Sequence, residues 1–212
     1  MSATGSGTHR VPYRVETGRL VLRCWAPEDA ASLRAQLDAS DEHLRPWIPF
    51  MADEPRTLAA TAAWLREHRA SFDLDWGYRY AVFDRSERSL LGENMLLKRV
   101  GAHALEIGYW IAVNATGHGY AREASAALVR VAFELLEVRR IEIHCAPGNR
   151  PSAAIPERLG FTHEATLRDR VVDTEGGHHD LMIWTLFAAD FPGSPAATAP
   201  IAAFDALGET LL

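Results

Sequence analysis

Hydrophobic and polar residues alternate along the chain with two different periods, and each period predicts a different kind of element. Alternation with a period of two predicts strands, which we place at residues 19–25, 77–84, 90–100, 104–113 and 139–146, with two more ending near residue 191. Helical spacing of apolar residues predicts helices, which we place at residues 26–40, 57–72, 120–137 and 151–160. This order of strands and helices indicates an α/β (α+β) protein with a mixed sheet, not a doubly wound one.

The length of the chain and the placement of its small residues indicate how it is organised. A chain of 212 residues is typical of one domain with a single core, which we expect over residues 15–191. Residues 1–14 are mostly small and polar and predict a flexible N-terminal tail. Residues 192–212 are rich in alanine and proline and predict a C-terminal tail that ends either in a short helix or in disorder.

The composition argues against several classes of protein. The hydrophobic fraction of 48% and the charged fraction of 24% are those of a globular protein in water. No apolar run approaches the roughly 20 residues that span a bilayer, and the N-terminus lacks the apolar segment of a secretory signal. The cysteines, Cys24 and Cys145, form no metal-binding pair, and the net charge of −6 argues against nucleic-acid binding. We therefore expect a cytoplasmic monomer or homodimer that binds neither nucleic acid nor membrane.

A glycine-rich turn separates the strand at 104–113 from the helix that follows it. In "VNATGHGYAREA" (113–124), Gly117 and Gly119 can adopt positive φ and bring bare backbone close to a bound group. A helix that begins there directs N–H groups and the positive end of its dipole outward, which favours phosphate. The alternative is an ordinary turn that needs glycine only for its φ angle. A dinucleotide-binding motif is disfavoured, because Arg122 occupies the third glycine position and several strands precede the turn.

Several motifs, in the correct order, resemble one known family. "NATGHGYA" (114–121) is similar to the R/Q-x-x-G-x-G/A element of GCN5-related N-acetyltransferases (GNAT), although Asn114 stands where Arg or Gln is usual. Further segments resemble the branch of ribosomal-protein alanine and serine N-acetyltransferases (RimJ/RimL-like): "HLRPWIPF" (43–50), "LEIGYWI" (105–111), "NRPSAAIPERLGF" (149–161) and "GGHHDLMIWTL" (176–186). The similarity covers roughly residues 15 to 190.

The resemblance implies the GNAT fold with acetyl-coenzyme A (acetyl-CoA) as co-substrate. In that fold two neighbouring parallel strands splay apart, and the pantetheine arm of the coenzyme lies between them. The main-chain groups of Ile111 and Val113 would pair with this arm, and Asn149 would hydrogen-bond it. The residues expected around the pyrophosphate are those of the glycine turn: Gly117, His118, Gly119, Tyr120 and Ala121. The side chains of His118 and Arg122 either contact phosphate or are solvated residues at a helix start.

The implied reaction requires a neutral amine as the nucleophile. A lysine-like ammonium has a pKa near 10.4, so neutralising it at pH 7 costs about 4.6 kcal/mol, against about 1 kcal/mol for an α-amine with a pKa of about 7.7. A carboxylate that accepts the proton is therefore expected. Glu106 is our candidate, because related acetyltransferases place a basic glutamate on this strand, where it shares a face with Gly108 and Trp110. The alternative is a structural or exposed glutamate.

The departing thiolate needs an acid or a hydrogen-bond donor. Many family members use a tyrosine four residues before the glycine of the "GF" pair, but Pro156 occupies that position here. Ser152, three residues after Asn149, matches the serine that the ribosomal-protein branch is thought to use near the sulfur. Its alternative role is to cap the short helix. The glutamate that this branch carries on its sixth strand aligns with Val171, so that candidate base is missing.

Aromatic and histidine residues complete the candidate site. Trp47 and Phe50 lie in a proline-rich segment that would roof the acceptor site, where they are either apolar walls or anchors that hold the segment to the core. His178, His179 and Asp180 resemble a metal-binding cluster. Adjacent residues of a strand point to opposite faces, however, and cannot readily share one ion. We therefore expect no metal.

These observations predict an enzyme that moves the acetyl group of acetyl-CoA to a primary amine by direct attack. The acceptor is either a protein N-terminal α-amine or a small-molecule amine. One alternative is a coenzyme A-binding module with weak catalysis, which Asn114, Pro156 and Val171 suggest. The other is a nucleotide-binding protein that uses the glycine turn for a different phosphate.

Overall fold

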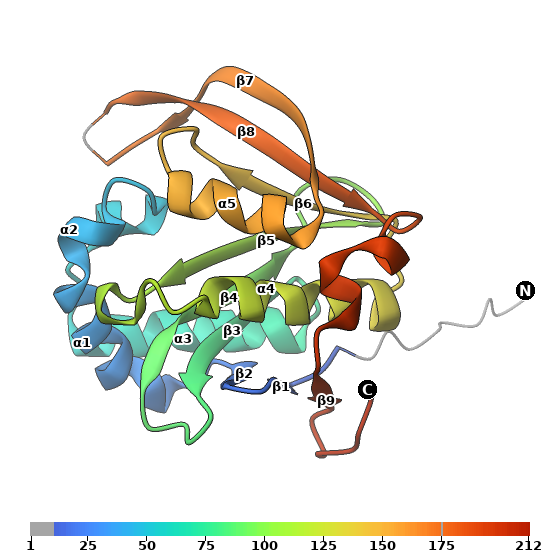
Figure 1. Cartoon of the computed structure of the whole chain (residues 1–212). Helices are drawn as coiled ribbons and strands as arrows, with labels where there is room; N and C mark the ends of the chain where they lie inside the picture. The colour runs from blue at the N-terminus through green and yellow to red at the C-terminus, as the bar shows by residue number, and fades with distance from the viewer. Residues whose placement is uncertain (1–10, 175) are drawn as a thin grey trace, which may run out of the picture.

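The computed structural model describes residues 11–174 and 176–212, which form one mixed β-sheet (Figure 1). Its strands are β1 (Arg14–Glu16), β2 (Leu20–Cys24), β3 (Gly77–Asp84), β4 (Leu90–Leu97), β5 (Ala104–Ile111), β6 (Arg140–Cys145), β7 (Thr162–Val172), β8 (His178–Phe187) and β9 (Ala202–Phe204). Their order is β7-β8-β6-β5-β4-β3-β2-β1-β9, and within these residues only β5 and β6 run parallel. The predicted mixed, mostly antiparallel sheet is confirmed. The sequence predicts about seven strands because β1 and β9 have only three residues each, too few to show alternation.

Helices connect and cover the strands. In the described part of the chain the α-helices are α1 (Ala30–Ala39), α2 (Asp41–Leu44), α3 (Leu58–Asp73), α4 (Tyr120–Arg130) and α5 (Arg150–Leu159). Shorter turns are η1 (Pro27–Asp29), η2 (Pro49–Asp53), η3 (Val113–Ala115), η5 (Phe191–Gly193), η6 (Pro195–Thr198) and the π-helical η4 (Val131–Leu135), which continues α4. The four predicted helices are present, and α2 is an additional single turn. None of the helices described is both long and apolar enough to cross a membrane.

Apolar residues pack on both faces of the sheet. One cluster joins the sheet to α4 and includes Ile107 and Leu128. The other joins the sheet to α1 and α3 and includes Leu33, Leu65 and Trp110. Ile107 and Trp110 contribute to different clusters because residues separated by an odd number of positions on a strand point to opposite faces.

β5 and β6 separate before β5 ends. They pair at three positions, the last of which is Glu106 on β5, while β5 continues to Ile111. The amide of Ala112 donates to the carbonyl of Leu91 on the β4 side (2.9 Å). Main-chain polar groups alternate in direction along a strand, so those of Tyr109 and Ile111 face the gap between β5 and β6.

The C-terminal segment is part of the fold. Residues 192–212, for which the sequence predicts a tail, add β9 to the sheet beside β1, and Ala196 and Ala203 are fully buried. Alanine has a small side chain that lets η6 pack closely on α4, and this contact cannot be seen in the composition. Most of the predicted N-terminal tail, residues 1–10, lies outside the described residues.

Candidate active site

A cavity of about 720 Å³ lies where β5 and β6 separate. Its walls are the end of β5, the glycine turn, α5 and the roof loop (residues 41–56). Tyr109 and Ile155 pack with the cluster beneath α4, whereas Ile48 and Trp110 belong to the cluster beneath α1 and α3. The lining therefore comes from both faces of the sheet, so two molecules could meet in the gap from opposite sides.

Most of the residues predicted for the site line this cavity. They are Trp47, Ile111, Gly117, His118, Gly119, Tyr120, Ala121, Asn149 and Ser152. Glu106, Val113 and Phe50 do not line it. Tyr109 and Arg158 also line it, although their sequence pattern marks them only as a core residue of a strand and a polar residue near a helix end.

The glycine turn presents bare backbone to the cavity. Gly117 and Gly119 adopt φ angles of 79° and 77°, a region that costs other residues about 1–2 kcal/mol. Gly119 precedes α4 with no side chain capping the helix, so the first N–H groups have no partner within the helix or from a side-chain cap. A Cβ added at Gly117 would meet nothing within 4 Å. The glycines thus provide the φ angles and leave open an end of the helix that suits phosphate.

Arg19, which directly precedes β2, holds the glycine turn in place. Its guanidinium donates to the carbonyl of His118 (3.0 Å) and pairs with Glu123 of α4 (2.5 Å). The same group lies over the ring of Tyr120, 4.8 Å from the centroid, and the rings of His118 and Tyr120 stack at 5.5 Å. These contacts order the turn before any ligand binds, which lowers the entropic cost of binding.

Two arginines add positive charge to the cavity. Arg122 lies in the first turn of α4 and Arg158 in the last turn of α5. Neither side chain forms a hydrogen bond or an ion pair with another residue in the described ranges. Arginine side chains pair well with phosphate oxygens. Both side chains are therefore available to a phosphorylated ligand. Because Arg122 lines the cavity, its position favours contact with phosphate over the role of a solvated residue at a helix start.

Val113 is not placed to pair with a ligand in the gap. Its amide donates to the hydroxyl of Ser40 (3.0 Å), and its carbonyl accepts from the hydroxyl of Thr116 (2.9 Å). The strand ends at Ile111 and the chain turns into η3, which redirects the main chain. The prediction that the main chain of Val113 faces the gap is therefore corrected. The residues of β5 whose main-chain groups face the gap are Tyr109 and Ile111.

Glu106 lies on the sheet outside the cavity. Its two carboxylate oxygens accept from Nε and Nη2 of Arg99 at 2.7 and 2.5 Å, and Nδ1 of His144 lies 3.5 Å away. The side chain is 4% exposed. A shielded carboxylate bound on both oxygens by a guanidinium is poorly placed to take a proton from an acceptor. The position of Glu106 therefore favours the structural alternative over the role of general base.

Ser152 lies in the first turn of α5 but does not cap the helix. The cap is Asn149, whose side-chain oxygen accepts from the amide of Ser152 (3.2 Å). The hydroxyl of Ser152 lies instead 3.1 Å from the hydroxyl of Tyr109, at the cavity wall. The helix-cap alternative for Ser152 is therefore wrong, and its hydroxyl interacts with Tyr109 instead.

Trp47 and Phe50 occupy different places in the roof loop. Trp47 lines the cavity and is 38% exposed, and a Cβ added at Gly148 would lie 3.6 Å from its ring. Phe50 packs against Trp64 of α3, with the ring centroids 5.2 Å apart. Trp47 is therefore placed as a wall of the cavity, whereas Phe50 anchors the loop, which was its alternative role.

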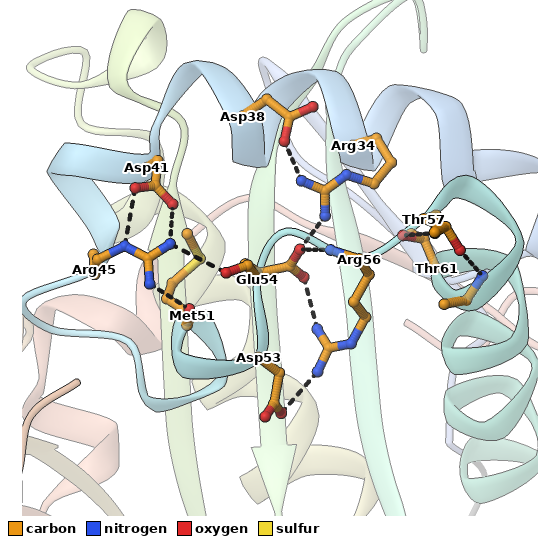
Figure 2. A network of polar contacts seen from close by, with 11 residues as sticks. Arg34, Asp38, Asp41, Arg45, Met51, Asp53, Glu54, Arg56, Thr57 and Thr61 are labelled. Atoms are coloured by element: carbon orange, nitrogen blue, oxygen red, sulfur yellow. Dashed lines mark hydrogen bonds and ion pairs between the residues drawn. The ribbon is translucent and has the colours of Figure 1, made fainter.

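A buried carboxylate holds the C-terminal end of the roof loop (Figure 2). The side chain of Glu54 is 1% exposed and pairs with Arg34 of α1 and with Arg56, the latter at 2.6 Å. Arg34 also pairs with Asp38 on its own helix. The roof loop is thereby bonded to α1, and its position relative to the sheet is fixed.

Arg45 braces the same loop from within. Its guanidinium pairs with Asp41 and donates to the carbonyl of Met51 (2.8 Å), as Figure 2 shows. The carbonyl of Arg45 accepts from the hydroxyl of Thr174 (3.3 Å), beside the turn between β7 and β8. In Figure 1 this hairpin arches past α5 toward α2. The roof loop and the hairpin thus meet at Arg45 and Thr174.

Replacing Glu54 with glutamine is expected to lower the free energy of unfolding by about 2 kcal/mol. Removing one partner of a buried ion pair typically costs about 3–5 kcal/mol, and here each arginine keeps one other carboxylate. For the acetyl transfer that the sequence predicts, kcat/KM should also fall, because the loop forms one wall of the cavity. Urea unfolding and steady-state kinetics measure both effects.

The matched control is Asp53→Asn. Asp53 pairs with the same Arg56 at 2.9 Å, but its side chain is 72% exposed, so its loss should cost less than about 1 kcal/mol. Equal losses of stability in the two variants would show that burial of Glu54 does not matter.

The two adjacent histidines take different partners. Nδ1 of His178 pairs with Asp169, and Nε2 of His179 lies 2.7 Å from Asp173. In the part of the chain that the structure describes, no group of three or more possible ligands is arranged to hold a metal ion.

Known proteins resemble this chain over most of its length. Residues 19–162 match the family described as "Acetyltransferase (GNAT) domain". The chain is 33% identical to the putative ribosomal N-acetyltransferase YdaF of Bacillus subtilis (strain 168), over 82% of this chain and 94% of that protein. It is 27% identical to the ribosomal protein uS5-alanine N-acetyltransferase of Escherichia coli (strain K12), over 85% and 94%. The structure of Mycobacterium smegmatis RimJ in complex with CoA-disulfide superposes with a TM-score of 0.72 at 26% identity, over 88% and 90%.

The fold, the glycine turn and these similarities agree, and the chain belongs to the GNAT acetyltransferase family. It is an acetyl-CoA-dependent N-acetyltransferase, related to the ribosomal-protein N-acetyltransferases. The predicted family and class of enzyme are confirmed. Membership of this family argues against the alternative of a nucleotide-binding protein that is not an acetyltransferase.

Proposed function

We propose that this enzyme transfers the acetyl group of acetyl-CoA directly to the α-amine at the N-terminus of a polypeptide. One observation carries the choice of amine: among the described residues, no Asp or Glu lines the cavity. The charged side chains of the lining are those of Arg122 and Arg158. The cavity thus offers no carboxylate to remove a proton from the acceptor.

This lack of a carboxylate discriminates between two kinds of acceptor. At pH 7 about one α-amine in six is already neutral, so water can deprotonate it at a cost of about 1 kcal/mol. A lysine amine is neutral in only about one molecule in 2,500, which corresponds to about 4.6 kcal/mol. The difference in cost is about 3.6 kcal/mol, or about 400-fold in rate. A site without a carboxylate base therefore suits an α-amine.

We assign the remainder of the cavity to acetyl-CoA. The pyrophosphate would lie against the main chain of residues 117–121, at the N-terminus of α4, with Arg122 and Arg158 as cationic partners for its phosphates. The pantetheine arm would occupy the gap beside β5, where the main-chain groups of Tyr109 and Ile111 lack a strand partner. This assignment is supported by the open glycine backbone and by the two arginines without a carboxylate partner.

The proposed reaction is a direct transfer. The amine nitrogen forms a bond to the thioester carbonyl carbon, and the bond from that carbon to sulfur breaks with its electron pair on sulfur. The nitrogen loses its proton to water, and the sulfur takes a proton from solvent. Ser152, at the cavity wall, would donate a hydrogen bond to the sulfur while negative charge develops there.

The relatives support a protein as the acceptor. YdaF is a putative ribosomal N-acetyltransferase, and the uS5 enzyme is an alanine N-acetyltransferase. The match with this chain covers more than nine-tenths of the length of each of these two proteins. The N-terminal amine of a ribosomal protein is therefore the first acceptor to test.

The test compares two peptides of matched sequence. One has a free N-terminus and no lysine, and the other has a blocked N-terminus and one lysine. At pH 7 we expect kcat/KM to be at least about 100-fold higher for the free N-terminus. Equal or higher kcat/KM for the lysine peptide would overturn the proposal.

Glu106→Gln is the informative variant in the same experiment. We expect its pH–rate profile with the free N-terminus to run parallel to that of the wild type, within about threefold, because Glu106 is bound by Arg99 outside the cavity. A loss that is largest at low pH and disappears as pH rises toward the pKa of the amine would identify Glu106 as the base after all.

A further inference from the structure

The phenol side chain of Tyr109 is largely buried and contacts Ser152. Its hydroxyl donates to the carbonyl oxygen of Ser152 (3.0 Å) and lies 3.1 Å from the serine Oγ, where either oxygen can be the donor. Both residues line the cavity, and Tyr109 lies on β5 beyond the last pair with β6. Burial raises the pKa of Tyr109 above its ordinary value. The phenol therefore remains protonated and can act as a donor throughout the neutral pH range.

The hydroxyl proton of Tyr109 has two possible acceptors on Ser152, the carbonyl oxygen and Oγ. Which of them accepts it determines where the hydroxyl proton of Ser152 points. A serine hydroxyl donates one hydrogen bond and accepts two. When Tyr109 donates to the carbonyl, Ser152 can direct its own proton back to the phenol oxygen. When Tyr109 donates to Oγ, the serine proton is released to point into the cavity. The first arrangement is the one in which the phenol donates to the carbonyl, and because the two distances differ by only 0.1 Å, a rotation of the phenol hydroxyl gives the second.

Cys145 is a further neighbour of Ser152. Burial raises the pKa of the Cys145 thiol, and the nearby polar groups of Ser152 and Trp184 oppose that effect. The serine hydroxyl thus lies among two weakly acidic groups that are both neutral. Neither of them supplies a charge that would compete with a bound ligand for the serine proton.

We propose that Tyr109 is a positioning residue for acetyl transfer, which donates to Oγ of Ser152 and leaves the serine proton directed at the sulfur of the departing coenzyme A. This inference rests on the proposed function, in which Ser152 donates to that sulfur. As the bond from carbon to sulfur breaks, its electron pair goes to sulfur and the serine hydrogen bond stabilises the charge. Tyr109 and Ser152 keep their protons, and sulfur is finally protonated by water.

The two residues come from different elements: Tyr109 lies on β5, and Ser152 lies on the first turn of α5.

The experiment is a double-mutant cycle on kcat with Tyr109→Phe, Ser152→Ala and the double variant. We expect Tyr109→Phe to lower kcat about tenfold with an unchanged KM for acetyl-CoA, since one hydrogen bond to a reacting group is lost. The double variant should be no slower than Ser152→Ala, because Tyr109 acts only through Ser152. The loss in Tyr109→Phe should stay constant between about pH 6 and pH 9, because the phenol does not ionise there.

Tyr80→Phe is the matched control. The hydroxyl of Tyr80 is fully buried and donates to the carbonyl of Pro12 (2.9 Å), so its loss should reduce stability and leave kcat unchanged. The inference is overturned if Tyr109→Phe behaves like Tyr80→Phe, or if the losses of Tyr109→Phe and Ser152→Ala multiply. It is also overturned if Ser152→Ala keeps full turnover. Failure of the wild type to acetylate an N-terminal amine would instead overturn the proposed function itself.

Discussion

Replacement of Ser152 with alanine is expected to lower kcat about 100-fold, with little change in the KM for acetyl-CoA. One donor aimed at developing charge in a site that excludes water typically contributes about 10²–10³ in kcat. The hydroxyl of Ser152 lies at the cavity wall beside Tyr109. Because Asn149 caps α5, the substitution removes no helix cap, and the free energy of unfolding should stay nearly the same. Steady-state kinetics and thermal unfolding measure the two effects separately.

Thr57→Ala provides the matched control for a hydroxyl that does cap a helix. Its side chain accepts from the amide of Ala60 at the start of α3 (3.2 Å). Its loss should cost about 1 kcal/mol of stability and leave kcat unchanged. Ser152→Thr keeps a hydroxyl at the cavity and should retain most of the activity. A Ser152→Ala variant that is less stable but fully active would contradict the role proposed for Ser152.

Gly119→Val is expected to raise the KM for acetyl-CoA at least about tenfold, while the KM for the acceptor changes less than about twofold. Gly119 has a φ of 77°, where a residue with a Cβ is strained by about 1–2 kcal/mol, and a β-branched residue by more. Relief of that strain would shift the turn whose N–H groups face the cavity. Isothermal calorimetry with acetyl-CoA should show the same loss of affinity as the kinetics.

Gly208→Val separates backbone strain from loss of the phosphate site. Gly208 has nearly the same φ, 81°, and an added Cβ would meet nothing within 4 Å. It lies near the C-terminus, outside the cavity lining. Its substitution should therefore leave the KM for acetyl-CoA unchanged. A similar rise of KM in both variants would mean that general loss of structure, not the glycine turn, causes the effect.

The elements that the sequence predicts correctly are those with a long, regular period. β5 and α4 are examples, because each has enough residues for its apolar positions to repeat. β1 and β9 have three residues each, and they are strands because neighbouring strands pair with them. No local pattern reveals such pairing, and for the same reason the alanine-rich segment of η6 and β9 resembles a tail.

The candidate site divides in a similar way. The glycine turn and Ser152 can be found from the sequence because their chemistry requires particular residue types at fixed spacings. The role of Glu106 cannot, because it depends on Arg99, which reaches the carboxylate from outside β5. Tyr109 is overlooked because its place in an alternating strand predicts only a core residue, while its contact with Ser152 comes from tertiary packing.

The most direct test uses one peptide that carries both a free N-terminus and an internal lysine. The peptide is incubated with the enzyme and acetyl-CoA at pH 7, and tandem mass spectrometry locates the acetyl group. We predict acetylation at the N-terminal α-amine, with the lysine unmodified. An acetyl group on the lysine, or release of coenzyme A without acetylation of the peptide, would contradict the account.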